Sequence, residues 1–195
     1  MKLNFDEFYE KNMNIKIKKL RLEGASELLI KKKSDDRGWF ARFFCQEELF
    51  AVNKGKDIQQ INSSFSEKKG TTRGMHYQNK PYQEDKIVSC LQGKVYDVIV
   101  DIRPNSNTFG QWTSTILSSE KMNAVYIPKG FAHGYQTLCN NCQMLYLHTE
   151  VYNQNSESGF RHTSPYLDIK WPLKTTNISI KDSELKNFSG KKNDL

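Results

Sequence analysis

Residues Ile87 to Phe131 read IVSCLQGKVYDVIVDIRPNSNTFGQWTSTILSSEKMNAVYIPKGF. Apolar and polar residues alternate at 95–102, 112–117 and 124–127, and glycine, proline or polar turn residues separate these runs. A period of two is typical of a strand with one buried face, and strands repeated about every 8–12 residues are typical of sandwiches and barrels. This stretch therefore predicts the wall of an all-β barrel.

The same pattern continues on both sides of this stretch. Further strands are expected at residues 15–22, 28–30, 39–44, 58–65, 71–77, 86–91, 134–138 and 144–148. A short helix is expected at 46–52, and an extended segment with a second short helix at 174–188. The sequence thus predicts one jelly-roll barrel with short peripheral helices at residues 14–188, an N-terminal extension at 1–13 and a flexible tail at 189–195. It contains no glycine-rich strand-to-helix turn, so a Rossmann or P-loop nucleotide site is not expected.

The composition favours an anionic partner. Lysine and arginine number 29 against 22 aspartate and glutamate, which gives a formal net charge of +7. The basic residues do not gather in one arm or helix, so a small phosphorylated substrate fits this charge as well as a nucleic acid does. No apolar run approaches the roughly 18 residues of a membrane span, and the N-terminus lacks the apolar core of a signal peptide. We therefore expect a cytoplasmic protein.

Metal binding is not expected from the histidines and cysteines. The histidines are His76, His133, His148 and His162. Metal-binding barrels usually offer two histidines two residues apart with a glutamate nearby, whereas His76 is followed by tyrosine and glutamine. Cys139 and Cys142 form a C-x-x-C pair without the second pair of a zinc site, which predicts free thiols.

The neighbours of His76 favour a ligand site over a purely structural role. Gln60 and Asn62 are two residues apart and so share one face of a predicted strand. Amides that point into a barrel usually line a cavity, because burying an unpaired amide is costly. Basic residues that together could neutralise a diphosphate are Arg73, Lys86, Arg103 and Lys181. The alternative is that they are solvated surface charges, which is the favoured interpretation for Lys181 taken alone.

Short motifs that follow one another along the chain carry a family resemblance. They are DRGWF (36–40), QIN (60–62), RGMHYQ (73–78), KIV (86–88), Gly93, DVIVDIR (97–103), PKGFAHG (128–134), Tyr146, Glu157, IKWP (169–172) and SIKD (179–182). Each motif is weak alone, but the ordered set resembles the dTDP-4-dehydrorhamnose 3,5-epimerase family over residues 14–188. The resemblance implies a cupin-type jelly roll that inverts C3, C5 or both on a nucleotide-diphosphate-linked 4-keto-6-deoxyhexose, in deoxysugar and polysaccharide biosynthesis. It implies neither a cofactor nor a metal.

The resemblance also implies roles for individual residues. His76 is the expected base that removes a proton beside the C4 ketone, and Asp182 orients it. Tyr146 is expected to return a proton on the opposite face, and Lys86 to stabilise the enolate. The positions that match substrate contacts are Arg37, Gln60, Asn62, Arg73, His133, Glu157 and Lys181. The implied partners are a nucleotide-diphosphate sugar and a second copy of the chain, with exchange of N-terminal strands, rather than a nucleic acid or a membrane.

Two positions depart from the family pattern. Arg42 stands at a substrate-binding position where the family carries a glutamate, in a region that contributes to the nucleotide site of the neighbouring subunit. A carboxylate accepts the N–H of thymine and an arginine cannot, so Arg42 favours an acceptor edge such as that of cytosine or guanine, or a phosphate. A CDP- or GDP-linked sugar is therefore an alternative to a dTDP-linked one. Ser164 replaces the aspartate of an Asn-Asp-Pro motif, at a place that either supports the fold or braces the site.

Other functions stay open at this point. Inversion at C3 alone depends on the shape of the cavity around the sugar ring. A 3,4-ketoisomerase on the same fold would also use a histidine base, although the matches at Tyr146 and Asp182 favour the epimerase. A non-catalytic cupin that binds a sugar nucleotide is the alternative from another class.

Overall fold

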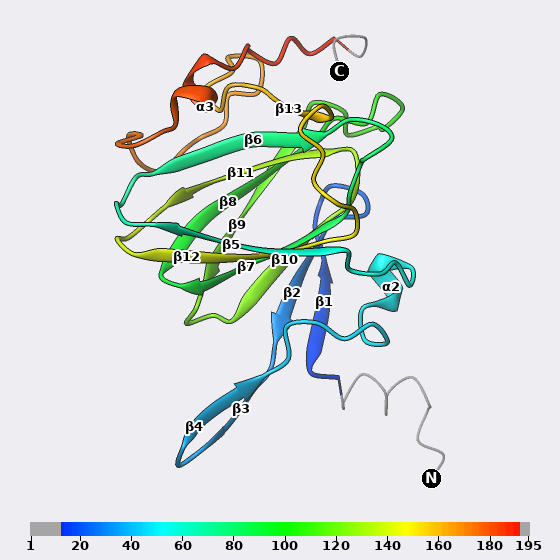
Figure 1. Ribbon diagram of the computed structural model, residues 1–195, viewed down its shortest axis with the longest axis vertical. Coiled ribbons are helices and arrows are strands. Elements are labelled where there is room, and N and C mark those ends of the chain that lie inside the picture. The colour runs from blue at the N-terminus through cyan, green and yellow to red at the C-terminus, as the bar shows by residue number, and fades with distance from the viewer. Residues whose placement is uncertain (1–12, 192–195) are drawn as a thin grey trace.

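The computed structural model describes residues 13–191, which form two packed antiparallel sheets and a separate hairpin (Figure 1). The six-stranded sheet has the order β1 (Ile15–Lys19), β2 (Ser26–Ile30), β10 (Asn123–Ile127), β7 (Lys86–Gln92), β12 (Cys142–His148), β5 (Gln60–Ser66). The five-stranded sheet has the order β13 (Glu157–Gly159), β6 (Thr72–Gln78), β11 (Phe131–Thr137), β8 (Lys94–Asp101), β9 (Trp112–Ser118). The hairpin pairs β3 (Lys32–Asp35) with β4 (Gly38–Ala41), and the helices are α2 (Phe50–Asn53) and α3 (Ile180–Glu184). The predicted N-terminal extension up to residue 12 and the predicted tail from residue 192 lie outside the described residues.

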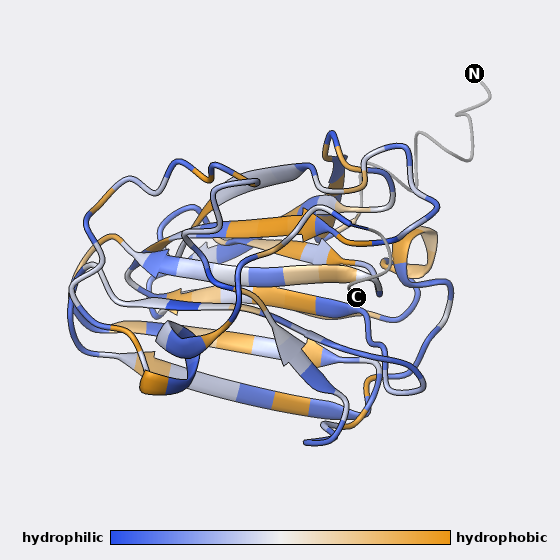
Figure 2. Cartoon of the chain, turned by 90° about the horizontal axis from the view of Figure 1, so that it is seen from above, coloured by the Kyte–Doolittle hydropathy of each residue, from blue (hydrophilic) through white to orange (hydrophobic). Residues whose placement is uncertain are grey.

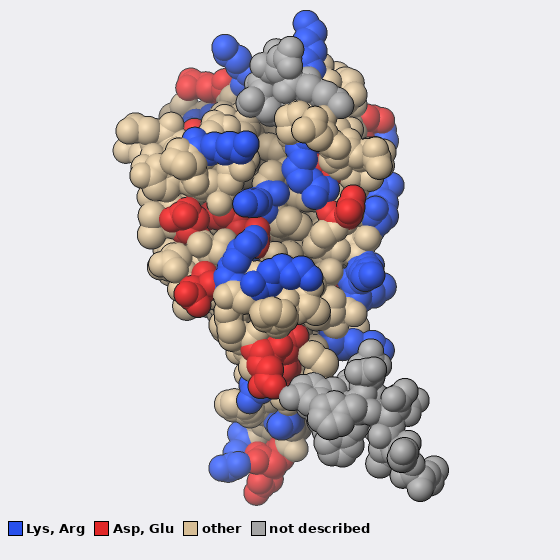
Figure 3. Space-filling model, turned by 90° about the vertical axis from the view of Figure 1, so that its right-hand side faces the viewer, with Lys and Arg blue, Asp and Glu red and all other residues tan. Residues whose placement is uncertain are grey.

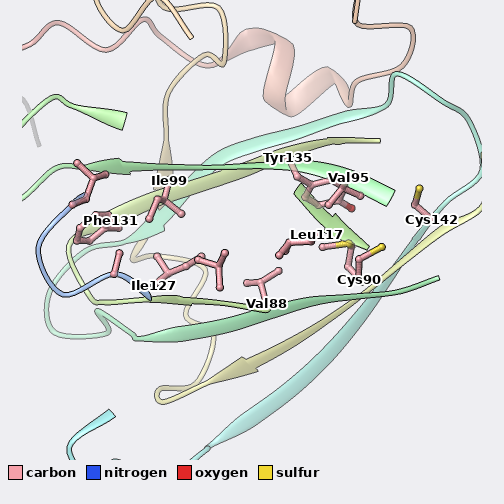
Figure 4. Packing of buried hydrophobic residues seen from close by; sticks show 13 residues of the cluster. Val88, Cys90, Val95, Ile99, Leu117, Ile127, Phe131, Tyr135 and Cys142 are labelled. Atoms are coloured by element: carbon pink, nitrogen blue, oxygen red, sulfur yellow. The ribbon is translucent and has the colours of Figure 1, made fainter. Parts of the chain in front are cut away.

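The apolar residues of the alternating strands meet between the two sheets. Val88 of β7, Val95 and Ile99 of β8, and Leu117 of β9 are at most 2% exposed and belong to one cluster (Figure 4). Their burial is the main stabilising term of such a fold, at about 25 cal/mol for each Å² of apolar surface removed from water. The banding of apolar and polar residues along the strands is visible in Figure 2. The fold confirms the predicted all-β jelly-roll barrel with short peripheral helices.

The outer faces of both sheets are also covered, which explains why several strands lack a wet face. The chain after β13 packs Phe160, Leu167 and Phe188 against Val98 and Val100 of β8. On the six-stranded sheet, Leu49 and its neighbours cover Ile87, Ala124 and Leu147. The predicted helix near the C-terminus is confirmed as α3, which lies above β6 (Figure 1).

Some of the predicted boundaries are wrong, for local reasons. Most of the helix expected at 46–52 consists of turns, and helical structure begins only at Phe50. The hairpin β3–β4 replaces the turn and longer strand that we expected near residues 34–44, and it projects from the barrel (Figure 1). Strand β11 begins at Phe131, three residues before the predicted start, and β13 was not predicted because it has only three residues. Neither helix within residues 13–191 has the length and apolar character needed to cross a membrane.

Candidate functional site

A cavity of about 600 Å³ lies between the inner faces of the two sheets. Strands β5, β7 and β12 line it from one sheet and β6, β11 and β13 from the other, and the segment that leads into α3 closes one side. The predicted site residues that line it are Asn62, Arg73, His76, Lys86, His133, Tyr146, Glu157, Lys181 and Asp182. The fold therefore gathers residues that are spread over more than half of the chain.

His76 and Asp182 form a hydrogen-bonded pair in this cavity. The Nε2 of His76 lies 2.7 Å from Oδ1 of Asp182, and the backbone N–H of Gly74 donates to Oδ2 at 3.1 Å. Burial alone would raise the pKa of the Asp182 carboxyl, but the hydrogen bonds from His76 and Gly74 outweigh it and hold this pKa below its usual value. An ionised Asp182 accepts the Nε2 proton, which leaves Nδ1 of His76 as the basic nitrogen.

Local backbone geometry places both members of this pair. Gly74 has a φ of +98°, and a Cβ there would lie 2.6 Å from the carbonyl oxygen of His133 on β11, so only glycine fits. Asp182 sits in the first turn of α3, where its backbone N–H donates to the side chain of Ser179 as the helix cap. The glycine and the helix cap together fix how closely α3 packs against β6, and so fix the distance between Asp182 and His76.

Tyr146 faces His76 from the opposite sheet. Its hydroxyl lies 3.0 Å from Oγ of Ser64, which in turn lies 3.1 Å from the hydroxyl of Tyr135. Burial, followed by the neighbouring Tyr135, raises the pKa of Tyr146 well above its usual value. Tyr146 is therefore a neutral phenol at physiological pH and can only donate a proton.

A second histidine–carboxylate pair lies beside the first. The Nε2 of His133 is 2.7 Å from Oδ2 of Asp97, both side chains are buried, and His133 is paired directly with His76 in the register of β11 and β6. His133 was expected in the site from the sequence, whereas Asp97 was not. The signal was present, because Asp97 has the same parity along β8 as the core residues Val95 and Ile99.

Lys86 is held by the carboxylate of Glu84, which was likewise not expected in the site from the sequence. The Nζ of Lys86 lies 2.9 Å from Oε1 of Glu84, and Nδ1 of His148 lies 2.7 Å from Oε2 of the same side chain. Both Glu84 and His148 line the cavity. His148 is two residues from Tyr146 on β12, and this spacing was the available signal that it faces the same way.

The remaining charged residues of the cavity lie near its mouth. Glu157 accepts hydrogen bonds from Lys181 Nζ and the hydroxyl of Tyr152, each at 2.6 Å. Burial would raise the pKa of Glu157, but the Lys181 and Tyr152 hydrogen bonds hold it below its usual value. Arg73 donates to Oγ of Ser66 at 3.2 Å and to a backbone carbonyl at 3.1 Å, so its contacts in the described chain are to neutral oxygens. Its positive charge remains available to an anionic ligand.

Three predicted substrate contacts do not line the cavity of their own chain. Arg37 lies at the turn of the β3–β4 hairpin and pairs with Asp35 at 2.5 Å. Arg42 follows the hairpin and pairs with Glu48 at 2.7 Å. Gln60 uses its side-chain oxygen to accept the backbone N–H of Tyr152 at 2.9 Å, at the edge of the site.

Arg103 does not join the other basic residues, which corrects the expectation of a four-residue diphosphate cluster. Its guanidinium donates to Asp101 at 2.9 and 2.7 Å and lies 4.7 Å from the ring centroid of Phe131. These contacts are structural. On the face shown in Figure 3, lysine and arginine side chains are interspersed with aspartate and glutamate.

Ser164 has a structural role at the place where the motif departs from the family pattern. Its Oγ donates to the carbonyl of Arg161 at 2.5 Å and accepts the backbone N–H of Phe188 at 2.9 Å. Ser164 is 2% exposed and does not line the cavity. Among residues 13–191, no group of three or more His, Cys, Asp or Glu side chains is arranged to hold a metal ion.

Comparison with known proteins gives a consistent result over most of the chain. The sequence profile of dTDP-4-dehydrorhamnose 3,5-epimerase matches residues 19–190. The chain is similar to the protein of that name from Shigella flexneri, with 36% identity over 155 residues, 79% of this chain and 85% of the relative. It is also similar to a dTDP-4-dehydrorhamnose 3-epimerase from Streptomyces niveus, with 31% identity over 171 residues, 87% of this chain and 82% of the relative. The solved structure of the 3,5-epimerase RmlC from Legionella pneumophila in complex with dTDP-4-keto-L-rhamnose aligns with a TM-score of 0.84 and 36% identity, over 89% of this chain and 92% of that chain.

Proposed function

The chain belongs to the dTDP-4-dehydrorhamnose 3,5-epimerase family, and we propose that it inverts C3 and C5 of a nucleotide-diphosphate-linked 4-keto-6-deoxyhexose of the dTDP-4-dehydro-6-deoxyglucose type. The observation that carries this proposal is the placement of a carboxylate-supported base, His76, and a neutral phenol, Tyr146, on facing sheets of one cavity. We propose that the protein acts in deoxysugar biosynthesis and in the cytoplasm.

Proton removal falls to His76 in this mechanism. Nδ1 takes the proton from the carbon beside the C4 ketone, and the electron pair of the broken C–H bond moves into an enolate whose charge rests on the C4 oxygen. Asp182 stabilises the imidazolium that forms. Lys86 supplies the positive charge that stabilises the enolate oxygen. This charge lowers the activation barrier because the ammonium group is already in position when the enolate forms.

Return of the proton falls to Tyr146. Its O–H gives a proton to the same carbon from the opposite face, so the C4 ketone forms again and the configuration at that carbon is inverted. The hydroxyl of Ser64 stabilises the resulting phenolate, and exchange with solvent carries the proton from His76 back to Tyr146. C3 and C5 both adjoin the C4 ketone, so this one pair of residues serves both positions without a redox step.

Substrate recognition completes the proposal. Arg73 and Lys181 at the mouth of the cavity are suited to the diphosphate, and the buried His133–Asp97 pair and Asn62 to hydroxyl groups of the sugar. Burying the imidazole of His133 without a hydrogen-bond partner would cost free energy, and its hydrogen bond to Asp97 offsets this cost.

A homodimer is the second part of the proposal. The β3–β4 hairpin projects from the barrel (Figure 1), and its Trp39 and Phe40 are 56% and 67% exposed. We propose that this hairpin carries Arg37, and the segment directly after it Arg42, to the nucleotide end of the partner's cavity. We also propose that the N-terminal strand β1, which pairs with β2 of its own chain in this structure, is exchanged between subunits. Sedimentation at micromolar concentration is expected to give a dimer, and a monomer under these conditions would contradict the arrangement.

Solvent exchange tests the catalytic proposal. The protein is incubated in D2O with dTDP-4-dehydro-6-deoxyglucose, and deuterium at C3 and C5 is followed by NMR. We expect incorporation at both positions, and its loss in His76→Ala. Incorporation at C3 alone would identify a 3-epimerase, as in the Streptomyces niveus relative. No incorporation with dTDP-, CDP- or GDP-linked substrates, combined with tight binding of one of them, would identify a non-catalytic binding protein.

The same assay tests the nucleotide. Arg42, which is paired with Glu48, is the residue that favours a CDP- or GDP-linked sugar over a dTDP-linked one. A higher kcat/KM for dTDP than for CDP or GDP substrates, unchanged in Arg42→Glu, would remove Arg42 from nucleotide selection. A shift of preference toward dTDP in this variant would support the alternative.

A further inference from the structure

One buried carboxylate connects two strands in the wall of the cavity. Glu84 is 9% exposed and precedes β7; its Oε1 lies 2.9 Å from Nζ of Lys86, and its Oε2 lies 2.7 Å from Nδ1 of His148. Lys86 and His148 are directly paired in the register of β7 and β12. Glu84 therefore holds two basic side chains that face each other across neighbouring strands.

The hydrogen bonds of His148 fix its ring. Nδ1 donates to the carboxylate of Glu84, and Nε2 lies 3.5 Å from the amide nitrogen Nδ2 of Asn62, which is a donor. A neutral ring with its proton on Nδ1 satisfies both neighbours, because Nε2 is then an acceptor. The same arrangement turns the side-chain oxygen of Asn62 away from His148, so His148 also orients the amide of Asn62.

The ring of His148 also packs against the proposed acid. The ring centroids of His148 and Tyr146 are 6.1 Å apart, and their planes are inclined by 23°. The two residues lie two apart on β12 and so project from the same face. On its other sides, Tyr146 is held through its hydroxyl by Ser64, and the ring of His133 contacts it edge-on with centroids 6.4 Å apart. His148 is therefore one of two ring contacts that restrain the tyrosine ring, and the one that stacks on it.

We propose that Glu84 and His148 act as a positioning pair that aligns Lys86 and Tyr146 for enolate formation and reprotonation. This inference rests on the proposed function. Lysine has a long flexible side chain, and its ammonium stabilises the enolate only from a fixed position. Glu84 supplies the anchor, while the N–H of His148 takes up part of the carboxylate charge. The ammonium of Lys86 therefore keeps donors free for the C4 oxygen.

The charge state of Glu84 agrees with this role. Burial would raise the pKa of its carboxyl, but the hydrogen bond from His148 and the charge of Lys86 outweigh burial and hold the pKa below its usual value. Glu84 is thus an ionised anchor at physiological pH. The groups that face His148 are Glu84 and Lys86 from the β7 side, Tyr146 from its own strand and Asn62 from β5.

Three variants separate the parts of this pair. His148→Phe keeps a ring against Tyr146 but removes both nitrogens, His148→Asn keeps a donor within reach of Glu84, and Glu84→Gln removes the charge. A misplacement of about 1 Å costs on the order of 100-fold in rate, so we expect kcat for inversion, followed by NMR of the product in D2O, to fall about 100-fold in His148→Phe and Glu84→Gln. KM is expected to change less than about threefold, because the diphosphate contacts remain. His148→Asn should recover about tenfold of the loss.

A double variant and a matched control complete the experiment. Groups that act as a unit are not additive, so Glu84→Gln/His148→Phe should be no slower than the slower single variant. Glu27→Gln is the control, because Glu27 is 4% exposed on β2 of the same sheet, binds Lys121 at 2.5 Å and Asn123 at 2.7 Å, and does not line the cavity. We expect it to lower the melting temperature and to leave kcat unchanged.

The outcomes distinguish this inference from the proposed function. Wild-type exchange combined with a wild-type kcat in folded His148→Phe would overturn the positioning role alone. A rise in KM at constant kcat, or an equal loss of kcat in Glu27→Gln, would overturn it as well. If the wild-type protein shows no exchange, the proposed function fails, and the positioning role for that reaction fails with it.

Discussion

Replacement of Asp182 by asparagine tests the His76 pair with a very small change in shape. In the native protein Oδ1 of Asp182 accepts from His76 Nε2 at 2.7 Å, and Oδ2 accepts from the backbone N–H of Gly74 at 3.1 Å. The side-chain oxygen of the asparagine will face Gly74, because it can accept the backbone N–H of Gly74. In the flipped orientation the amide NH2 would face this N–H, and both groups are donors. Its NH2 then points at His76 and donates to Nε2. This contact forces the ring proton onto Nδ1, the nitrogen that accepts the substrate proton in the proposed mechanism.

The size of the effect follows from this change of tautomer. In the serine protease triad, the wrong tautomer of the histidine lowers kcat by about 10⁴. We expect a fall of roughly 10³ to 10⁴ in kcat for the Asp182→Asn variant, equivalent to about 4–5.5 kcal/mol in activation free energy. The variant should still fold, because the asparagine side chain keeps one hydrogen bond to Gly74 and one to His76. The loss of the negative charge weakens these hydrogen bonds by less than about 3 kcal/mol.

The pH dependence of stability gives the same residue a second signature. The pKa of Asp182 is lower in the folded protein than its usual value of 3.8, so the folded state binds fewer protons there than the unfolded chain. Its contribution to the free energy of unfolding is therefore fully present above pH 3.8 and is lost as the pH falls through the lower folded value. The stability difference between wild type and Asp182→Asn should be constant near neutral pH and should narrow below pH 3.8.

The assay compares exchange of deuterium into dTDP-4-dehydro-6-deoxyglucose with chemical denaturation of the same samples. Asp168→Asn is a matched control, because Asp168 is an exposed aspartate that pairs with Lys170 at 2.5 Å. Its φ of 46° is one that asparagine adopts readily. The control should exchange at the wild-type rate. A folded Asp182→Asn variant within tenfold of the wild-type kcat would refute the assignment of His76 and Asp182 as base and orienting carboxylate.

Three further predictions concern residues with separate roles. Tyr146→Phe keeps the ring and the His76 base, so deuterium should still enter the substrate while inversion falls at least about 100-fold; an equal loss of both in the NMR assay would contradict this. His162 is buried with Nδ1 unpartnered, and burial lowers its pKa below 6.5. The unfolded chain therefore binds more protons below pH 6.5, stability falls with acid, and a His162→Phe variant should flatten that slope in denaturation titrations; an unchanged slope would assign the effect elsewhere. Ser164→Ala leaves the buried N–H of Phe188 without its acceptor, which should lower the free energy of unfolding by about 1–3 kcal/mol at an unchanged kcat; a stable variant with impaired turnover would instead place Ser164 in the site.

The sheets were predictable because their signal is local. Strand β8 was expected at 95–102 and is found at 94–101, since its alternation records directly which side faces the core. The hairpin β3–β4 lacks this signal: Lys32–Asp35 has no buried residue, so neither face is marked by apolar side chains. Around Leu49 the apolar residues suggested a helix, but they cover the outside of the six-stranded sheet, and packing there requires only one helical turn. Tertiary contacts decided both cases.

Site residues that belong to a recognisable motif could be predicted from the sequence. The pairing of side chains that are distant in the sequence could not. His76 and Asp182 are 106 residues apart, and no spacing rule relates them, so only the family resemblance placed them together. Asp97 shows what the pattern itself can yield. It shares its parity on β8 with core residues, and a carboxylate on a buried face requires a donor partner, because isolated burial of its charge is prohibitive. The neighbouring strand β11 brings His133 to within 2.7 Å. Glu84 precedes β7 and so takes no part in the alternation of buried and exposed residues along that strand. Its hydrogen bond to His148 can be recognised only once β7 and β12 are paired.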